Sequence, residues 1–147
     1  MNTNIENIEK GLAGVRKALL SYRPSAVEQK QATLLSIKAL SDCKPNPFWL
    51  KGCCGRMLYL NPAYTKAFKV SAEAYLGSKD HAQWDKNTAE SFKCNDGEVI
   101  LKGKAMKFIE EVLLEGEVHR YHILKWPVYM NGQIIGVAGE SLGGYDG

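Results

Sequence analysis

The stretch Phe48-Trp-Leu-Lys-Gly-Cys-Cys-Gly-Arg-Met-Leu-Tyr-Leu-Asn-Pro62 carries the strongest signal for the fold. Two short apolar runs, residues 48–51 and 56–60, flank a Gly-Cys-Cys-Gly segment, which predicts a β-hairpin with a glycine turn. Asn61-Pro62 predicts a short helix that ends near Phe68, because proline at the first position is typical of a helix start. The chain is therefore expected to pass directly from a two-stranded hairpin into a helix.

The rest of the chain after Phe68 contains helices first and strands afterwards. Ser71 is expected to cap a one-turn helix that Gly77 ends, and a longer helix is expected over residues 86–102. Three extended segments follow, at residues 105–114, 118–129 and 133–142, with turns at Glu115-Gly-Glu117 and Asn131-Gly132. Because parallel βαβ alternation is absent, this order predicts an α+β fold with a single five-stranded antiparallel sheet.

Two capping boxes, Thr3-Asn-Ile-Glu6 and Ser25-Ala-Val-Glu28, mark helix starts before the hairpin. They predict helices over residues 4–22 and 26–41, which form either a helical hairpin or a kinked rod. The first helix carries a heptad seam of apolar residues, which is typical of an interface between helices. The seam consists of Ile5, Ile8, Leu12, Val15, Leu19 and Tyr22. We therefore predict a helical segment for dimerisation at residues 1–44 and a globular domain at residues 45–147.

The composition is that of an ordinary globular protein of 147 residues, with 45% hydrophobic and 24% charged residues. The net charge of +3 is small and evenly spread, which argues against direct binding of nucleic acid. No apolar run approaches the roughly 18 residues that span a bilayer, and the polar N-terminus does not resemble a signal peptide. The four cysteines lack metal-type spacing, so we expect free thiols in a cytoplasmic protein.

The predicted strands are apolar on both alternating sets of residues. Met57 and Tyr59 alternate with Leu58 and Leu60, and both sets are apolar. A sheet with one solvated face would alternate apolar and polar residues, so both faces must be covered. The helices between the second and third strands can cover one face. The N-terminal helices or a partner subunit must cover the other, and alternation alone does not say which set of residues faces inward.

Several segments, taken in order, resemble the PAS domain, a small ligand-binding sensor module of bacterial signalling proteins. The segments are residues 47–51, 55–62, 70–77, Asp80-His81 with Trp84, 110–112, 125–127 and 132–137. The resemblance covers residues 47–142 and implies a cavity between the sheet and the short helices. Two features depart from the family: Gly52-Cys-Cys54 stands where an Asp is usual, and the closing Asp-Ile-Thr motif is missing. The chain is then either a stand-alone PAS protein or a fragment.

The family's strand pattern, counted from Pro127, implies which residues line the cavity. With two aromatic residues from the helical side, they are Met57, Tyr59, Trp84, Phe92, Ile109, Glu111, Tyr121, Ile123 and Lys125. Apolar walls beside two charged groups and a phenol are typical of a ligand pocket. The alternative is that Glu111 and Lys125 form a cross-strand ion pair without a ligand, and that Trp84 and Phe92 only fill the core.

The sequence leaves the cofactor unknown, and it disfavours flavin and haem. The flavin-binding branch of the family carries a reactive cysteine in its helical region, which residues 77–84 lack. The haem-binding branch commonly uses a histidine of the long helix, and residues 86–102 contain none. No metal site is expected, since His119 and His122 lie on opposite faces of a predicted strand.

No catalytic motif such as a G-x-S-x-G elbow or a P-loop occurs, so we do not expect an enzyme. The resemblance implies a sensory module that binds a small molecule in its core and signals through the N-terminal helices. We expect it to act as a homodimer on a separate signalling protein, without direct contact with nucleic acid or a membrane. The alternative is a ligand-free adaptor for dimerisation and protein–protein interaction.

Overall fold

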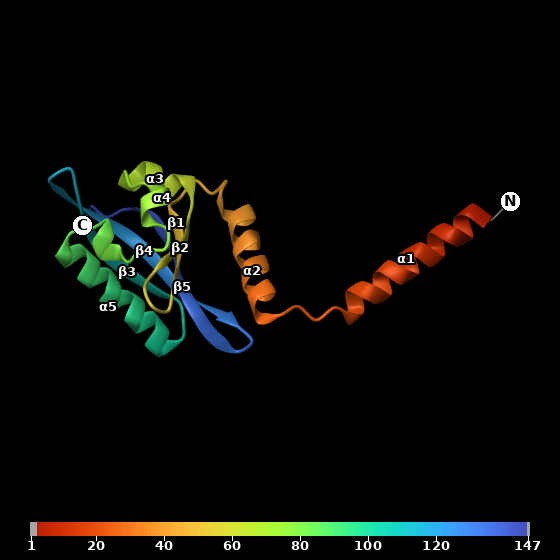
Figure 1. The fold of residues 1–147 in the computed structure, drawn as a ribbon. Helices are drawn as coiled ribbons and strands as arrows, with labels where there is room; N and C mark the ends of the chain where they lie inside the picture. The colour runs from red at the N-terminus through yellow and green to blue at the C-terminus, as the bar shows by residue number, and fades with distance from the viewer. Residues whose placement is uncertain (1–2, 147) are drawn as a thin grey trace. The chain divides into compact units, whose positions relative to one another are not determined.

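Figure 1 shows the fold in a computed structural model, which describes residues 3–146 and, within them, all side chains except those of Thr3 and Leu19. The chain divides into two compact units, and the division falls between Leu35 and Ser36. Each unit is described by itself below. The predicted boundary at residues 44 and 45 stays a prediction.

The first unit consists of α1 (Thr3–Ser21) and the beginning of α2 (Ala26–Ser41), which confirms both predicted N-terminal helices. The hydroxyl of Ser25 accepts a hydrogen bond of 3.2 Å from the Glu28 amide, which is one of the two bonds of a capping box, while the Glu28 carboxylate accepts one from the Tyr22 hydroxyl. The seam of α1 is exposed: Ile5, Ile8, Leu12, Val15 and Tyr22 are each between 58% and 64% accessible. The side chain of Leu19, the remaining seam residue, lies outside the described part of the chain.

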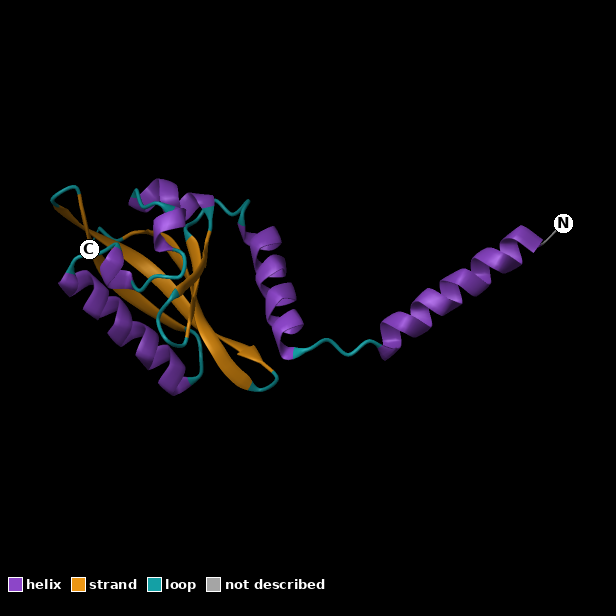
Figure 2. Ribbon diagram, in the orientation of Figure 1, coloured by secondary structure: helices purple, strands orange, loops and turns teal. Residues whose placement is uncertain are grey.

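The second unit contains one antiparallel sheet of five strands, coloured orange in Figure 2, which confirms the predicted α+β class. The strands are β1 (Phe48–Gly52), β2 (Met57–Leu60), β3 (Met106–Leu114), β4 (Glu117–Met130) and β5 (Gln133–Gly144). Their order across the sheet is β2-β1-β5-β4-β3. The last strand of the chain therefore lies at the centre and joins the two hairpins.

Four helical segments connect β2 to β3, and the sequence predicted all of them except the 3-10 helix. They are α3 (Pro62–Phe68), α4 (Ala72–Tyr75), the 3-10 helix η1 (Asp80–Ala82) and α5 (Lys86–Lys102). The side chains of Asn61, Ser71 and Asp85 accept hydrogen bonds from backbone amides at the starts of α3, α4 and α5. Helix α5 packs against β3, β4 and β5, and so covers one face of the sheet, the inner face.

The β3–β4 hairpin decides which β3 residues reach the inner face. Leu114 pairs with Glu117 across a loop of two residues, so Glu110 lies opposite Tyr121. Residues directly opposite each other share a face of the sheet. The predicted inward orientation of Ile109 and Glu111 is therefore wrong: the expected three-residue turn would have shifted the register by one residue, which reverses the faces. Both side chains are exposed, Ile109 by 45%.

An irregularity between β1 and β2 corrects a second expectation. The register shifts after Leu50, so that Leu60 pairs with Trp49 and Met57 pairs with Lys51. Met57 and Leu60 consequently both reach the core on the inner face, while Tyr59 lies on the opposite, outer face. The prediction that Tyr59 lines the cavity is wrong. Its ring packs against Phe48 with 6.0 Å between the centroids, and its hydroxyl donates a hydrogen bond to Asp42.

Candidate functional site

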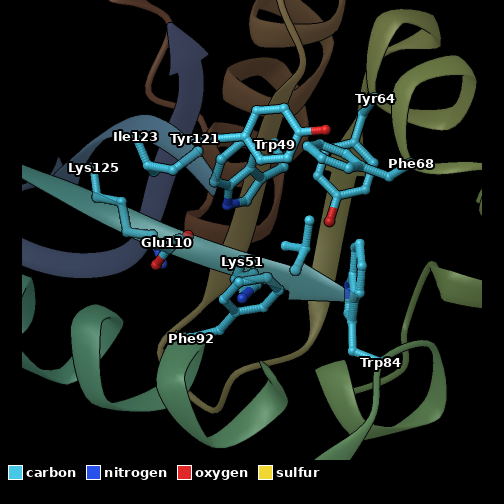
Figure 3. Close-up of a pocket in the computed structure, with 11 residues that line it drawn as sticks. Trp49, Lys51, Tyr64, Phe68, Trp84, Phe92, Glu110, Tyr121, Ile123 and Lys125 are labelled. Atoms are coloured by element: carbon cyan, nitrogen blue, oxygen red, sulfur yellow. The ribbon is translucent and has the colours of Figure 1, made fainter. Parts of the chain in front are cut away.

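A small cavity lies on the inner face of the sheet, between the strands and the helical segments (Figure 3). It is lined by Trp49, Lys51, Tyr64, Phe68, Trp84, Phe92, Glu110, Val112, Tyr121, Ile123 and Lys125. Its volume is about 20 Å³, which is room for one water molecule. A larger ligand therefore requires some of these side chains to move.

The aromatic side chains of the cavity contact one another edge to face. The ring centroids of Trp49 and Tyr64 lie 5.4 Å apart, and those of Tyr64 and Phe68 lie 4.7 Å apart. Trp84 continues the series, 5.7 Å from Phe68 and 5.5 Å from Phe92. Such pairs favour defined ring orientations, so the apolar wall of the cavity has a fixed shape.

The indole nitrogen of Trp84 is a hydrogen-bond donor without a well-aligned acceptor. Trp84 is 7% accessible, and its Nε1 is the one buried side-chain nitrogen or oxygen atom in the described part of the chain that makes no hydrogen bond of ordinary length and angle. The Tyr64 hydroxyl is the neighbouring polar group that interacts with it. Figure 3 shows the Trp84 ring among the other residues that line the cavity. An unpaired buried donor costs roughly 1–3 kcal/mol, so an acceptor bound in the cavity would recover that cost.

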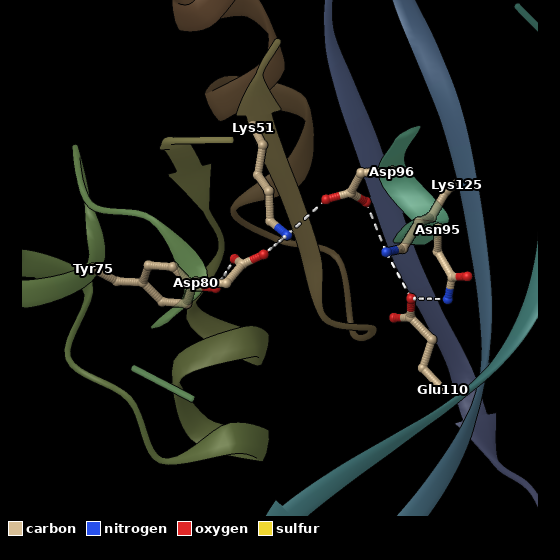
Figure 4. Close-up of polar contacts among 7 residues, drawn as sticks. All are labelled: Lys51, Tyr75, Asp80, Asn95, Asp96, Glu110 and Lys125. Carbon is tan, nitrogen blue, oxygen red and sulfur yellow. Dashed lines mark hydrogen bonds and ion pairs between the residues drawn. The ribbon is translucent and has the colours of Figure 1, made fainter. Parts of the chain in front are cut away.

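Five charged side chains form an ionic cluster beside the cavity (Figure 4). The ammonium of Lys51 lies 2.6 Å from an oxygen of Asp80 and 2.9 Å from one of Asp96. The ammonium of Lys125 lies 2.8 Å from the other Asp96 oxygen and 2.7 Å from Glu110. The side chains of the two lysines are only 3% and 1% accessible. The cluster joins β1, η1, α5, β3 and β4, and its residues extend from position 51 to position 125 of the sequence.

Two neutral side chains complete the ends of this ionic cluster. The Tyr75 hydroxyl donates a hydrogen bond of 2.6 Å to Asp80, and the Asn95 amide donates one of 2.8 Å to Glu110. Burial, together with the neighbouring Tyr64 and the Asp80 carboxylate, raises the pKa of Tyr75 far above its usual value, so the phenol stays protonated. Tyr75 is therefore a fixed donor to Asp80 at physiological pH.

The cluster contains three carboxylates and two ammonium groups, and the ammonium groups keep Asp96 ionised. Burial pushes the pKa of Asp96 upward, but attraction to Lys51 and Lys125 outweighs it and holds the pKa below its ordinary value. Burial likewise lowers the pKa of Lys125, and the attraction of Glu110 and Asp96 outweighs it and raises that pKa. A ligand that contacts Lys125 or Glu110 would disturb this balance.

The structure brings together only some of the residues predicted for the pocket. Trp84, Phe92, Tyr121, Ile123 and Lys125 line the cavity, and whether they bind a ligand stays a prediction. Met57 belongs to the same hydrophobic core without lining the cavity. Tyr59, Ile109 and Glu111 face elsewhere.

The Glu111–Lys125 ion pair, which was the alternative to a ligand, is also wrong. Lys125 pairs with Glu110 on the inner face, while Glu111 pairs with exposed Arg120 at 2.8 Å. Sequence reasoning missed the lining residues Trp49, Lys51, Tyr64, Phe68, Glu110 and Val112. The two-residue loop at Glu115-Gly116 is the signal that identifies Glu110 and Val112.

The described residues offer little for a metal. Among them, no group of three or more His, Cys, Asp or Glu side chains is arranged to hold an ion. Cys43, Cys53, Cys54 and Cys94 are free thiols, as expected, and all four are exposed. No helix in the described part of the chain is both long enough and apolar enough to cross a membrane.

Comparisons with known proteins agree with the geometry. A family model described as the PAS fold matches residues 45–142. The PAS domain of Bordetella pertussis BvgS is similar in structure, with a TM-score of 0.67 and 25% identity, over 75% of this chain and 85% of that one. No curated protein matches the chain in sequence.

Two VqmA structures share the fold. The phage VqmA–DPO complex has a TM-score of 0.68 at 18% identity, over 80% of this chain and 55% of that one. The Vibrio cholera VqmA–ligand–DNA complex has a TM-score of 0.62 at 23% identity, over 73% of this chain and 50% of that one. This chain thus spans about half the length of the VqmA chains.

Proposed function

Because this chain belongs to the PAS fold family, we propose that it is a sensory module that binds a small molecule in its core cavity. The observation that carries the proposal is the buried Nε1 of Trp84 on an aromatic-lined cavity, a donor that makes no well-aligned hydrogen bond. A ligand with an apolar ring and a hydrogen-bond acceptor meets both requirements. The ligand-bound VqmA structures support a small-molecule role for this fold, and the proposal includes no catalytic activity.

The ionic cluster offers a route from the ligand to the rest of the domain. Lys125 and Glu110 touch the cavity, and Asp96 links them through Lys51 to Asp80. A ligand that attracts one member of the cluster alters the charge balance at all five elements that hold it. The domain would then have two arrangements of these elements, one with the cluster intact and one with the cluster rearranged around the ligand. A switch requires that the two arrangements differ in their affinity for the ligand. We propose that the N-terminal helices transmit this difference, as a homodimer, to a separate signalling protein.

The variant Trp84→Phe tests the ligand half of the proposal. It keeps an aromatic ring in the wall and removes the N–H, so bound ligand loses one hydrogen bond, and its affinity is expected to fall about tenfold. In the free protein, removal of a poorly bonded buried donor is stabilising, and loss of ring contact is destabilising. The Tm of the free protein is therefore expected to change little. Native mass spectrometry of protein purified from cells, followed by thermal shift with the recovered molecule and with DPO, measures both.

Trp126→Phe is the matched control, because Trp126 packs against Phe48 on the outer face. It should leave ligand affinity unchanged. If the purified protein carries no small molecule and none raises its Tm, the ligand half of the proposal fails. An absorption spectrum of the same sample tests haem and flavin directly.

A ligand-free adaptor remains the second candidate, and the size of the cavity favours it. A volume of about 20 Å³ and two fully paired lysines describe a core that is closely packed and balanced in charge without a ligand. In that case the fold serves dimerisation or docking to a signalling partner. Both candidate functions include a homodimer, and only the sensory function includes a bound small molecule.

The double variant Leu12→Asp/Val15→Asp tests the dimer. Both side chains lie on the exposed seam of α1, and burying two carboxylates in a helical interface is strongly unfavourable. Light scattering is expected to show a dimer for the natural chain and a monomer for the variant. Leu20→Asp is the control, because Leu20 is 69% accessible on α1 and lies outside the seam. An unchanged mass in the double variant contradicts the seam as the interface.

Direct contact with nucleic acid is not part of the proposal. One VqmA structure contains DNA, but this chain matches only half the length of that protein. The net charge of +3 also supplies little attraction for phosphates. A gel-shift experiment with mixed-sequence DNA checks this expectation.

A further inference from the structure

A second, much larger hollow lies along one side of α5, outside the core cavity. It has a volume of about 660 Å³ and opens to solvent between α5, the β1–β2 turn and η1. Helix α5 contributes one face to it, namely Lys86, Ala89, Glu90, Lys93, Asp96, Gly97 and Ile100. Residues 51–55 and 79–81, with Trp84 and Val137, form the remainder. We call this hollow the α5 cleft. Its volume falls in the range of small-molecule sites.

The floor of the α5 cleft consists of apolar side chains and of carboxylates that already form ion pairs. Trp84, Ala89 and Val137 are buried apolar side chains there. The two floor carboxylates, Asp80 and Asp96, are both paired with Lys51. The floor therefore offers contact area to an apolar body and no free charge.

The rim of the α5 cleft carries an excess of positive charge. Lys79, Lys86 and Lys93 are exposed on it, and among the described residues none of them forms an ion pair. Glu90 is the rim's carboxylate, so three ammonium groups face one negative group. An occupant of this cleft should therefore be negatively charged at one end.

We propose that the α5 cleft is a binding site, separate from the core cavity, for an amphipathic organic anion. The apolar body of such a molecule would lie against Trp84, Ala89 and Val137. Its carboxylate, sulfonate or phosphate group would lie among Lys79, Lys86 and Lys93. The site does not require the core cavity to be occupied. The two sites share Lys51 and Trp84 as walls, so occupation of one changes the surroundings of the other.

Gly97 provides a way to close the α5 cleft without harming the fold. It lies inside α5 on the cleft wall, and a Cβ placed there would meet nothing within 4 Å. Glycine is unfavourable inside a helix, so a leucine at this position has room and improves helix formation. Gly97→Leu should therefore fold with an unchanged or higher Tm while its side chain occupies the cleft.

The test compares two dyes that share one ring system. 1-Anilinonaphthalene-8-sulfonate is an amphipathic anion, and N-phenyl-1-naphthylamine is the same molecule without the sulfonate. We expect the 147-residue chain to bind the anionic dye at least tenfold more tightly than the neutral dye at low salt, measured by fluorescence titration. Lys79→Gln/Lys93→Gln should weaken that binding about fivefold or more, and Gly97→Leu should abolish it. The control Lys66→Gln/Lys107→Gln removes two exposed lysines outside the cleft and should have no effect.

Thiol labelling locates the bound dye. Cys53 and Cys54 line the α5 cleft, whereas Cys43 and Cys94 are exposed thiols that do not. The anionic dye should slow maleimide labelling of the first pair and leave the second pair unchanged, as read by peptide mass spectrometry. The proposal is overturned if the neutral dye binds as tightly, if Gly97→Leu binds the anionic dye normally, or if Cys53 and Cys54 are not protected.

Discussion

Replacing Lys125 by methionine is expected to lower the free energy of unfolding by about 3–5 kcal/mol at pH 7. Lys125 is 1% accessible and holds Glu110 at 2.7 Å and Asp96 at 2.8 Å. Methionine fills much of the same space but removes the ammonium. Two carboxylates are then left in a buried site with only Lys51 nearby. Urea unfolding followed by tryptophan fluorescence measures the loss.

Arg120→Met is the matched control for this prediction. Arg120 forms an ion pair of the same length with Glu111, but both side chains are more than half exposed. Solvent screens such a pair, so its removal should cost less than about 1 kcal/mol. Adding Glu110→Gln to Lys125→Met removes one of the orphaned charges and should restore part of the stability. Equal losses in the two single variants would contradict the assignment of the ionic cluster as a buried network.

The loss in Lys125→Met should depend on pH. In the natural chain the pKa of Asp96 is lowered, so its contribution to stability is present above its unfolded pKa, about 3.9, and is lost as pH falls through the folded pKa. Lys125 has a raised pKa, so its contribution is complete below its unfolded pKa, about 10.4, and is lost as the pH rises through the higher folded pKa. Acid also neutralises the orphaned carboxylates of the variant. The difference between the two proteins should therefore shrink as the pH approaches 4.

Gly136→Ala is expected to cost about 3 kcal/mol of unfolding free energy, the upper part of the range for overpacking. Gly136 lies on the central strand β5, directly opposite Gly52 of β1. A Cβ at this position would lie 2.2 Å from the backbone oxygen of Lys51. A backbone atom cannot rotate away as a side chain can, so β1 and β5 would have to separate. Lys51, and the ionic cluster with it, would move as a consequence.

Gly97→Ala provides the contrast, because the same methyl group enters open space within α5. That variant should gain up to about 1 kcal/mol from better helix propensity. Both variants replace a glycine by alanine and so restrict the unfolded chain in the same way. Comparing their free energies of unfolding in urea therefore isolates the steric clash at Gly136. A Gly136→Ala protein as stable as the natural chain would show that β1 and β5 do not approach so closely.

The sequence predicted the elements of this fold because their signals are local. A capping residue contacts the amide three positions later, as Asn61 and Ser71 do, and those signals survive in any tertiary context. Alternation of side chains likewise placed Tyr121, Ile123 and Lys125 together on one face, and the family resemblance chose which face. Short segments thus determined the order and type of the strands and α-helices, and only the 3-10 helix η1 was missed.

Only the tertiary structure decided which acid meets Lys125 and what surrounds it. The length of the loop after β3 decides whether Glu110 or Glu111 faces inward, because a register shift of one residue turns every side chain of the strand to the other face. The irregularity after Leu50 reverses Tyr59 in the same way. The ionic cluster needs β1, η1, α5, β3 and β4 to meet, and its longest link joins residues 45 positions apart. Contacts over such separations depend on the packing of the whole domain, which no local pattern encodes.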